Sequence, residues 1–388
     1  MKVSFLVPDI ACPVLGPVTV LARTLQRHYP VQIVGPDLGH GVCPMYRGAF
    51  DYTVVPAPRL YRLPDFLWES RKLGAALTGD VIIAVKAFTD TVPVALREKK
   101  RRGAKVIVYL DEWDGALFWQ MSRGSRWRSV LRNLHHPLEE PFHPLVEKLI
   151  PRADLVISTS TWLQKKFGGR IVPVGVDTEF FKPSAPEQAA ALKRECGLEG
   201  LRCIVFGGVV RPHKGLEIIL DALVRLGRPD GRFVIVGPIN EHVKALQSNP
   251  TYRPYLTVLG AQPAARMPEF LSLADLIVLP LKDTLLARSQ MPCKIFEAMA
   301  MARPIIGTAI SDLPLVLEGC GKVVPPDDDA ALADAIARVL DHPDEAEAMG
   351  RAAREKCIRY YSREVTEREL VLSLEWIEQK KTKGTKTG

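Results

Sequence analysis

Residues 206–223, FGGVVRPHKGLEIILDAL, carry the pattern that decides the fold. A short apolar run ends in two glycines, the second being Gly208, and a loop with Arg211 and Lys214 leads to a helix expected from about Gly215. Glycine lets a ligand approach the backbone, and the first turn of a helix presents unpaired N–H groups. Arg211 can hold a phosphate bidentately, and Lys214 adds a point charge. The stretch is typical of a phosphate-binding turn, although a tight turn with solvated basic residues gives the same pattern.

On both sides of this stretch, short β-branched runs alternate with amphipathic segments. The alternation predicts an α/β fold in which helices cover both faces of parallel sheets. The expected strands are residues 3–7, 31–34, 81–85, 106–109 and 155–158, followed by 203–206, 232–236, 256–259, 276–279, 304–306 and 322–324.

The alternation pauses near residues 174–186, where prolines and other loop residues gather. We therefore expect two doubly wound domains, residues 1–174 and 175–360, with a ligand cleft between the carboxyl ends of their strands. A helix over 361–380 is expected to pack back on the first domain. The polar tail, 381–388, is expected to be disordered.

Length and composition exclude several classes of protein. The chain has 388 residues, 47% apolar and 25% charged, as expected for a soluble globular protein of two domains. No apolar run reaches the roughly 18 residues that span a bilayer, and the apolar start, MKVSFLVPDI, is too short for a signal peptide. Seven cysteines without a CxxC pair argue against a disulfide framework or a zinc site. These features predict a cytoplasmic protein.

The net charge of +8 is unevenly distributed. Residues 1–175 hold 24 Lys and Arg against 15 Asp and Glu, a balance of +9, and the remainder carries −1. The first half is therefore expected to meet a phosphorylated substrate, an anionic membrane surface or nucleic acid, unless the charge is simply solvated.

Two basic segments, 97–105 and 117–134, concentrate this charge. The second combines Phe118, Trp119 and Trp127 with arginines, which suits a lipid-phosphate acceptor or a lipid headgroup interface at the inner face of the membrane. The aromatic residues could equally belong to the core. Nucleic acid is disfavoured because no nucleic-acid-binding motif accompanies the charge.

A second informative stretch is residues 289–308, SQMPCKIFEAMAMARPIIGT. Pro292 suits the first turn of a helix, and Lys294 and Glu297 would then share one face of it. Lys294 could meet an anion, and Glu297 could accept two hydrogen bonds from a vicinal diol such as a ribose. A surface Lys–Glu pair would have the same spacing.

Further stretches follow in a recognisable order. They are ADLVISTSTWLQKKF, IVPVGVDTEFFKP, LTVLGAQPAARMPEFLSLADLIVLP and GKVVPPDDDAALADAI, which with the two above cover roughly residues 153–340. This order resembles the nucleotide-sugar domain of retaining GT-B glycosyltransferases of family 4. The resemblance implies two Rossmann-like domains facing across a cleft, with the acceptor bound by the first. It also implies metal-independent transfer of a sugar, with retention of configuration, from a UDP- or GDP-sugar to a glycan or lipid-linked acceptor.

The resemblance also implies roles for single residues. Lys214, aided by Arg211, would neutralise the donor diphosphate, and Glu297 would hold the ribose. Gly16, where a helix opens in the first domain, would face the phosphates. The donor site implied in this way comprises Gly16, Gly208, Lys214, Leu259, Gly260, Ser289, Gln290, Met291, Pro292, Lys294 and Glu297.

Three positions depart from the family's pattern. Ser289 replaces a glutamate that contacts the transferred sugar, Val209 replaces an arginine, and the segment 111–114, DEWD, replaces a histidine. These departures leave open the alternative that the protein binds nucleotide sugars without catalysing a reaction. A nucleotide-sugar epimerase of the same fold is a further alternative.

The DEWD segment follows a predicted strand and is acidic within a basic domain. Asp111 or Glu112 could orient the acceptor hydroxyl or stabilise positive charge at the anomeric carbon. Alternatively, Asp111 or Asp114 could cap a helix. No other acidic pair ends a strand, and the spacing of the histidines and glutamates in 135–143 does not fit a metal site, so no metal is expected. No enzymic nucleophile is evident, which favours front-face attack with proton transfer to the departing phosphate.

Overall fold

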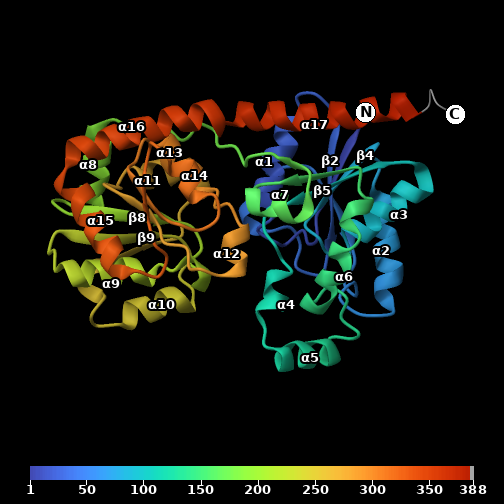
Figure 1. Cartoon of the computed structure of the whole chain (residues 1–388), viewed down its shortest axis with the longest axis horizontal. Coiled ribbons are helices and arrows are strands. Elements are labelled where there is room, and N and C mark those ends of the chain that lie inside the picture. Colours follow the sequence, from blue (N-terminus) through green and yellow to red (C-terminus); the bar gives the residue numbers. More distant parts are fainter. Residues whose placement is uncertain (385–388) are drawn as a thin grey trace. The chain divides into compact units, whose positions relative to one another are not determined.

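The computed structural model describes residues 1–384 and divides into two compact units (Figure 1). The first unit comprises Met1–Val174 and the segment from Thr366 onward, and the second comprises Gly175–Val365. The tail expected to be disordered from residue 381 lies outside the described residues from 385, and 381–384 continue the last helix. Within residues 1–384, no helix is both long and apolar enough to cross a bilayer.

The sheet of the first unit is parallel, with the order β3-β2-β1-β4-β5-β6-β7. Its strands are β1 (Val3–Leu6), β2 (Val31–Asp37), β3 (Tyr52–Pro56), β4 (Val81–Val85), β5 (Lys105–Leu110), β6 (Leu155–Ser158) and β7 (Arg170–Ile171). All residues of β4 are buried, which explains its unbroken apolar run. The edge strands β3 and β7 are partly exposed and were not expected, because they lack such a run.

Helices cover this sheet on both faces (Figure 1). They are α1 (Leu15–Leu25), α2 (Asp65–Ala76), α3 (Val92–Arg102), α4 (Ala116–Gln120), α5 (Arg123–Arg132), α6 (His143–Glu147) and α7 (Thr161–Phe167). The last helix, α17 (Arg363–Gly384), contributes Leu370, Leu374 and Ile377 to the hydrophobic core of the first unit. Their spacing places these three side chains on one stripe of the helix.

The second unit contains two parallel strand groups, β10-β9-β8 and β11-β12-β13. Ile204 of β8 and Leu276 form an isolated parallel bridge between the groups, so the strands follow the order typical of a doubly wound fold. The strands are β8 (Arg202–Gly207), β9 (Gly231–Val236), β10 (Leu256–Gly260), β11 (Ile277–Leu279), β12 (Ile305–Thr308) and β13 (Lys322–Val324). The parallel sheets of both units confirm the expected α/β fold.

The helices of the second unit lie around these strands. They are α8 (Pro186–Glu195), α9 (Glu217–Leu226), α10 (Glu241–Ser248), α11 (Met267–Leu271), α12 (Leu285–Ser289), α13 (Lys294–Ala300), α14 (Leu313–Leu317), α15 (Asp329–Asp341) and α16 (Pro343–Tyr360). The helix expected from about Gly215 begins two residues later, after a 3₁₀ turn, η4 (Pro212–Lys214). Gly215 interrupts the helix because its φ is +62° and a Cβ there would lie 2.3 Å from the Pro280 carbonyl oxygen.

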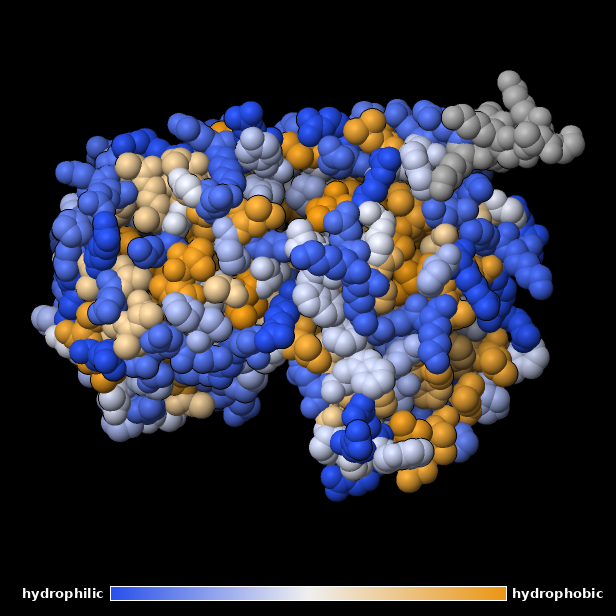
Figure 2. Space-filling model, viewed as in Figure 1, coloured by the Kyte–Doolittle hydropathy of each residue, from blue (hydrophilic) through white to orange (hydrophobic). Residues whose placement is uncertain are grey.

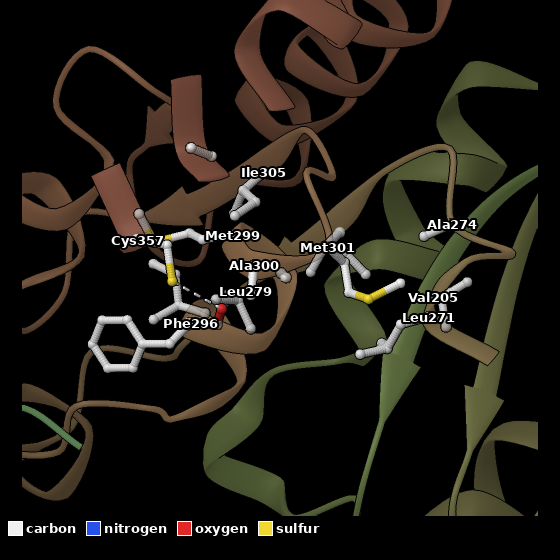
Figure 3. Packing of buried hydrophobic residues seen from close by; sticks show 14 of the residues in the cluster. Val205, Leu271, Ala274, Leu279, Phe296, Met299, Ala300, Met301, Ile305 and Cys357 are labelled. Carbon is white, nitrogen blue, oxygen red and sulfur yellow. Dashed lines mark hydrogen bonds between the residues drawn. The ribbon is translucent and has the colours of Figure 1, made fainter. Parts of the chain in front are cut away.

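Helix α13 is anchored in the core of the second unit (Figure 3). Phe296, Met299 and Ala300 are buried, and the Cys357 thiol donates to the Phe296 carbonyl oxygen at 3.5 Å. The partly exposed positions of the helix include Lys294 and Glu297. The packing of α13 in the core therefore fixes the positions of the Lys294 and Glu297 side chains.

Candidate functional site: a lysine-lined cavity in the second unit

A cavity of about 120 Å³ lies in the second unit where β8 ends, η4 turns and α13 begins. Much of its wall is apolar, but two lysines reach it. It is lined by Phe206, Gly207, Gly208, Val209, Lys214, Leu216, Leu279, Pro280, Leu281, Pro292 and Lys294. The two stretches singled out in the sequence therefore meet around one cavity.

Lys294 extends across the glycine pair at the end of β8. A Cβ built on Gly208 would lie 3.4 Å from the Lys294 side-chain carbon Cε. The Lys294 ammonium donates to both carboxylate oxygens of Glu297 at 3.1 Å. The pair expected on one helix face is therefore formed, and its lysine lines the cavity.

Lys214 reaches the cavity from the 3₁₀ turn. Its ammonium donates to the side-chain carbonyl oxygen of Gln290 at 2.9 Å. Because an amide carries no charge, this contact orients the ammonium without neutralising it. A phosphate entering the cavity would therefore meet a positioned lysine cation.

The structure thus brings together six of the expected donor-site residues. Gly208, Lys214, Pro292 and Lys294 line the cavity, whereas Gln290 and Glu297 hold its lysines. Arg211, at the start of η4, is exposed and does not line the cavity.

Four other positions do not line the cavity. Ser289 is fully buried, and its hydroxyl donates to the Leu286 carbonyl oxygen at 2.8 Å, so the expectation that it faces the donor needs correction. The Met291 side chain is buried in the core. Leu259 and Gly260 end strand β10 without lining the cavity, and the Gln262 amide donates to the Leu259 carbonyl oxygen.

Gly16 is the second residue of α1, in the first unit. A Cβ built there would lie 2.4 Å from the hydroxyl oxygen of Tyr46. Packing against Tyr46 is therefore one reason for glycine at this position, and a role facing phosphates stays a prediction.

The DEWD segment surrounds a lysine that the sequence analysis missed. The Lys86 ammonium lies 2.5 Å from Glu112 Oε1, 2.8 Å from Asp114 Oδ1 and 3.4 Å from Asp111 Oδ1. The residue follows β4 with a φ of +65°, and its side chain is only 7% exposed. The helix-capping interpretation is wrong, because α4 begins after Gly115 and no side chain caps it.

Burial governs the protonation of this cluster. Burial opposes the charged form of Lys86, but the three carboxylates outweigh it and raise the pKa of the ammonium well above its usual value. Burial raises the pKa of Asp114 to about 7, and it also raises the pKa of Asp111, although Lys86 acts in the opposite direction. The cluster therefore combines a permanent cation with carboxyl groups that hold protons easily.

Two further buried polar groups lie near the ends of the first sheet's strands. His143 packs on Phe88, with ring centroids 4.7 Å apart, and burial lowers its pKa. Asp90, in the loop after β4, is 1% exposed, and burial raises its pKa to about 8. Backbone hydrogen bonds oppose the effect of burial on both pKa values: those of Asp114 and Leu138 act on the His143 ring, and that of Asp90 acts on its own carboxylate.

Comparison with known proteins finds a family match within the second unit. Residues 201–342 match the family described as Glycosyl transferases group 1. The chain is 30% identical over 181 residues to alpha-D-kanosaminyltransferase of Streptomyces kanamyceticus, covering 45% of each chain. It is 26% identical over 260 residues to a GDP-mannose-dependent alpha-(1-6)-phosphatidylinositol monomannoside mannosyltransferase of Mycolicibacterium smegmatis, covering 62% of this chain and 68% of that one. The chain spans about half to two thirds of the length of such relatives.

Solved structures extend the likeness to the whole chain. Anabaena HepE in complex with UDP has a TM-score of 0.74 and 19% identity, over 97% of this chain and 100% of that one. Sucrose-phosphate synthase from Thermosynechococcus elongatus has a TM-score of 0.74 and 18% identity, over 98% and 99%. At such identities the likeness establishes the fold, which is that of GT-B glycosyltransferases. The chain therefore has the fold of GT-B glycosyltransferases, and its residues 201–342 are similar to the family described as Glycosyl transferases group 1.

Proposed function

We propose that this chain transfers a glycosyl group from a nucleoside-diphosphate sugar to an acceptor hydroxyl. The observation that carries the proposal is the meeting of Lys214, Lys294 and Gly208 around one cavity within the matched domain. Two lysines and an exposed backbone are what a departing diphosphate needs, because positioned cations stabilise the negative charge that develops on it.

Each residue of the cavity has a proposed role. Lys214, oriented by Gln290, meets the diphosphate, and Gly208 leaves room for a phosphate oxygen beside the backbone. Glu297 accepts hydrogen bonds from the ribose hydroxyls while Lys294 compensates its charge. Arg211, exposed three residues before Lys214, can swing toward the donor.

We further propose a UDP- or GDP-sugar as donor, retention of anomeric configuration and neutralisation of the diphosphate by lysines rather than a divalent ion. A relative named for GDP-mannose dependence and a structural neighbour crystallised with UDP support the two nucleotides. The family resemblance supports retention. The two lysines at the cavity support the metal-free mechanism.

Turnover with a donor panel tests this function. UDP-, GDP- and ADP-sugars are incubated with the chain, and release of the nucleoside diphosphate is measured. Lys214→Met should lower the rate at least about 100-fold, the order of loss for removing one charge-stabilising group. Lys244→Met is the matched control, because its side chain is 60% exposed on α10 and pairs with the exposed Glu241.

The alternatives give different products. Binding of a nucleotide sugar without turnover would indicate a non-catalytic protein, and an epimerised sugar would indicate an epimerase. An unchanged rate for Lys214→Met would refute the assigned role.

We also propose a glycan or lipid-linked acceptor, reached at the inner, cytoplasmic face of an anionic membrane. Helix α5 supports this location, because none of its residues is buried. Trp127 and Leu131 are 70% and 66% exposed among its arginines. Figure 2 shows hydrophilic and hydrophobic atoms side by side over α4 and α5. Such a surface can insert apolar groups while its arginines meet anionic headgroups.

Vesicle sedimentation tests the membrane proposal. The chain should sediment with vesicles containing phosphatidylglycerol and remain in solution with phosphatidylcholine alone. Trp127→Ser should weaken the binding, whereas Trp68→Ser, which removes a 64% exposed tryptophan of α2, should not. Equal effects of the two variants would refute a specific role for α5.

A further inference from the structure

We propose that Thr308 is a positioning residue for the donor cavity. Its buried hydroxyl holds the segment 279–282, and this segment in turn holds the turn η4, which carries Lys214. The inference rests on the proposed function, in which Lys214 meets the donor diphosphate. It concerns the second unit alone, and Thr308 itself does not line the cavity.

The Thr308 hydroxyl is bonded to the wall of the cavity. Thr308 is the last residue of β12 and is only 2% exposed. Its hydroxyl donates to the Leu281 carbonyl oxygen at 2.9 Å, and the Leu279 carbonyl oxygen lies 3.5 Å away. Leu279, Pro280 and Leu281 all line the cavity, so the hydroxyl holds this wall from behind.

The hydrogen bond acts where the sheet has ended. Strands β11 and β12 are parallel, and their register ends with Leu279 beside Gly307. Leu281 lies two residues beyond the end of β11, outside the ladder of backbone hydrogen bonds. The Thr308 side chain ties it back to β12. The position of this part of the wall therefore depends on a side chain.

The same segment supports the turn η4. The Lys282 backbone N–H donates to the His213 carbonyl oxygen at 3.3 Å. The Gly215 backbone approaches the Pro280 carbonyl oxygen so closely that a Cβ on the glycine would lie 2.3 Å from it. These two contacts flank Lys214 in the sequence. They therefore fix the turn from which its side chain reaches the cavity.

A surface ion pair adds a weaker contact to the segment. The Lys282 ammonium pairs with the Glu217 carboxylate at the start of α9, and both side chains are more than a third exposed. Such pairs contribute little free energy, because water and salt screen them. Loss of the Thr308 hydroxyl instead withdraws a hydrogen-bond partner from a residue, Leu281, that is 1% exposed, which costs more. The main anchor of the wall is therefore Thr308.

The ribose side of the proposed donor site is held in a different way. Glu297 lies on α13, which packs in the core through Phe296 and Met299. Loss of the Thr308 hydroxyl should therefore weaken binding of the diphosphate and leave binding of the nucleoside unchanged. A merely structural role of Thr308 would lower stability without producing this difference.

Equilibrium titrations of the full chain with UDP and uridine, followed by ligand-observed NMR, measure the difference. GDP and guanosine serve in the same way if the parent prefers them. Thr308→Val replaces the hydroxyl by a methyl group, and it should reduce the affinity ratio of diphosphate to nucleoside roughly 3- to 10-fold. Thr308→Ser keeps the hydroxyl and should stay within about twofold of the parent ratio. An unchanged ratio in Thr308→Val, or an equal loss in Thr308→Ser, would overturn the proposal.

Thr24→Val is the matched control. Thr24 is also 2% exposed, and its hydroxyl donates to the Val20 carbonyl oxygen at 2.8 Å, but it lies on α1 in the first unit. This variant should lose stability and keep the parent ratio. An equal fall in the ratio would show that loss of any buried hydroxyl bond weakens binding, and it would refute a specific role of Thr308.

Hydrogen exchange in the chain without nucleotide separates this proposal from the proposed function. The backbone N–H groups of Lys214 and Gly215 donate within η4, and that of Lys282 donates to His213. In Thr308→Val these amides should exchange at least about threefold faster than in the parent, and in Thr24→Val at the parent rate. Unchanged exchange in Thr308→Val would overturn the inference, whatever the nucleotide does. Faster exchange, in a protein whose parent form binds neither UDP nor GDP, would support the link from Thr308 to η4 and refute the proposed function alone.

Discussion

Replacing Lys86 by methionine removes the buried cation that three partly buried carboxylates share. The side chain keeps a similar length and apolar stem, so the main change is the loss of charge. In the parent, the ammonium lies 2.5 Å from Glu112, 2.8 Å from Asp114 and 3.4 Å from Asp111, and methionine can form none of these ion pairs. Removing one partner from a buried ionic network typically costs about 3–5 kcal/mol, because it leaves uncompensated buried charge.

This free-energy cost corresponds to a measurable decrease in melting temperature. For a unit of this size, 1 kcal/mol lowers the melting temperature by roughly 2–4 °C. The first unit of Lys86→Met should therefore melt about 6–20 °C below the parent in differential scanning calorimetry. Lys72→Met is the matched control, because its side chain is 57% exposed and pairs with Glu69 at the surface. Such surface pairs contribute about 0–1 kcal/mol.

The sign of the pH dependence makes the prediction specific. Burial already raises the pKa of Asp114 to about 7, and loss of Lys86 removes an interaction that lowers it. The folded variant then binds protons that the unfolded chain releases above pH ~4, so its stability rises as pH falls. The deficit relative to the parent should be larger at pH 8 than at pH 5.

A compensating variant completes the test. Adding Glu112→Gln and Asp114→Asn to Lys86→Met neutralises the two carboxylates closest to the lost ammonium and should recover most of the stability. A deficit below about 1 kcal/mol that stays constant between pH 5 and pH 8 would refute the reasoning.

Three single positions allow further predictions. The pKa of Asp90 is about 8 in the folded protein, against an ordinary value of 3.8. The free energy of unfolding therefore falls as pH rises between these two pKa values, by up to ~1.4 kcal/mol per pH unit. Asp90→Asn should flatten this slope in denaturant titrations. Gly215→Ala places a Cβ against the Pro280 carbonyl oxygen at a position whose backbone is left-handed. The substitution should lower the free energy of unfolding in urea by at least about 1–2 kcal/mol and weaken nucleotide binding. A variant as stable as the parent would contradict the turn geometry. Phe296→Ala empties part of the core beneath α13 and should cost about 3–5 kcal/mol by the same measurement, with a loss below 1 kcal/mol contradicting that packing.

The sequence predicted the buried strands well for a physical reason. Strands such as β4 are covered on both faces and consist of apolar residues without interruption. The edge strand β3 is half exposed, so it lacks that signature. The start of α9 was misplaced because the left-handed turn at Gly215 depends on the backbone of Pro280, far away in the sequence.

The donor side of the candidate site was largely predictable, because its residues lie in two short stretches. The hydrogen bond between Lys214 and Gln290 joins those stretches, and it could not be predicted because it forms only once the fold brings the two residues together. Ser289 shows the limit of carrying a position over from a family, since a short hydroxyl side chain bonds back to its own helix instead of reaching outward.

The polar cluster of the first unit could not be predicted from the sequence. Lys86 is a single lysine after an apolar run, and nothing in its neighbourhood in the sequence links it to the acidic segment 111–114. The pairing of β4 with β5 brings the two together. His143 comes from a third segment, so its place beside Phe88 was likewise invisible in the sequence.

A crystal structure of the chain with bound UDP or GDP tests the central claim most directly. The account predicts the diphosphate in the cavity of the second unit, with an oxygen within about 4 Å of the Lys214 ammonium and the ribose hydroxyls on the Glu297 carboxylate. A nucleotide bound in another place, with Lys214 and Glu297 untouched, would contradict it.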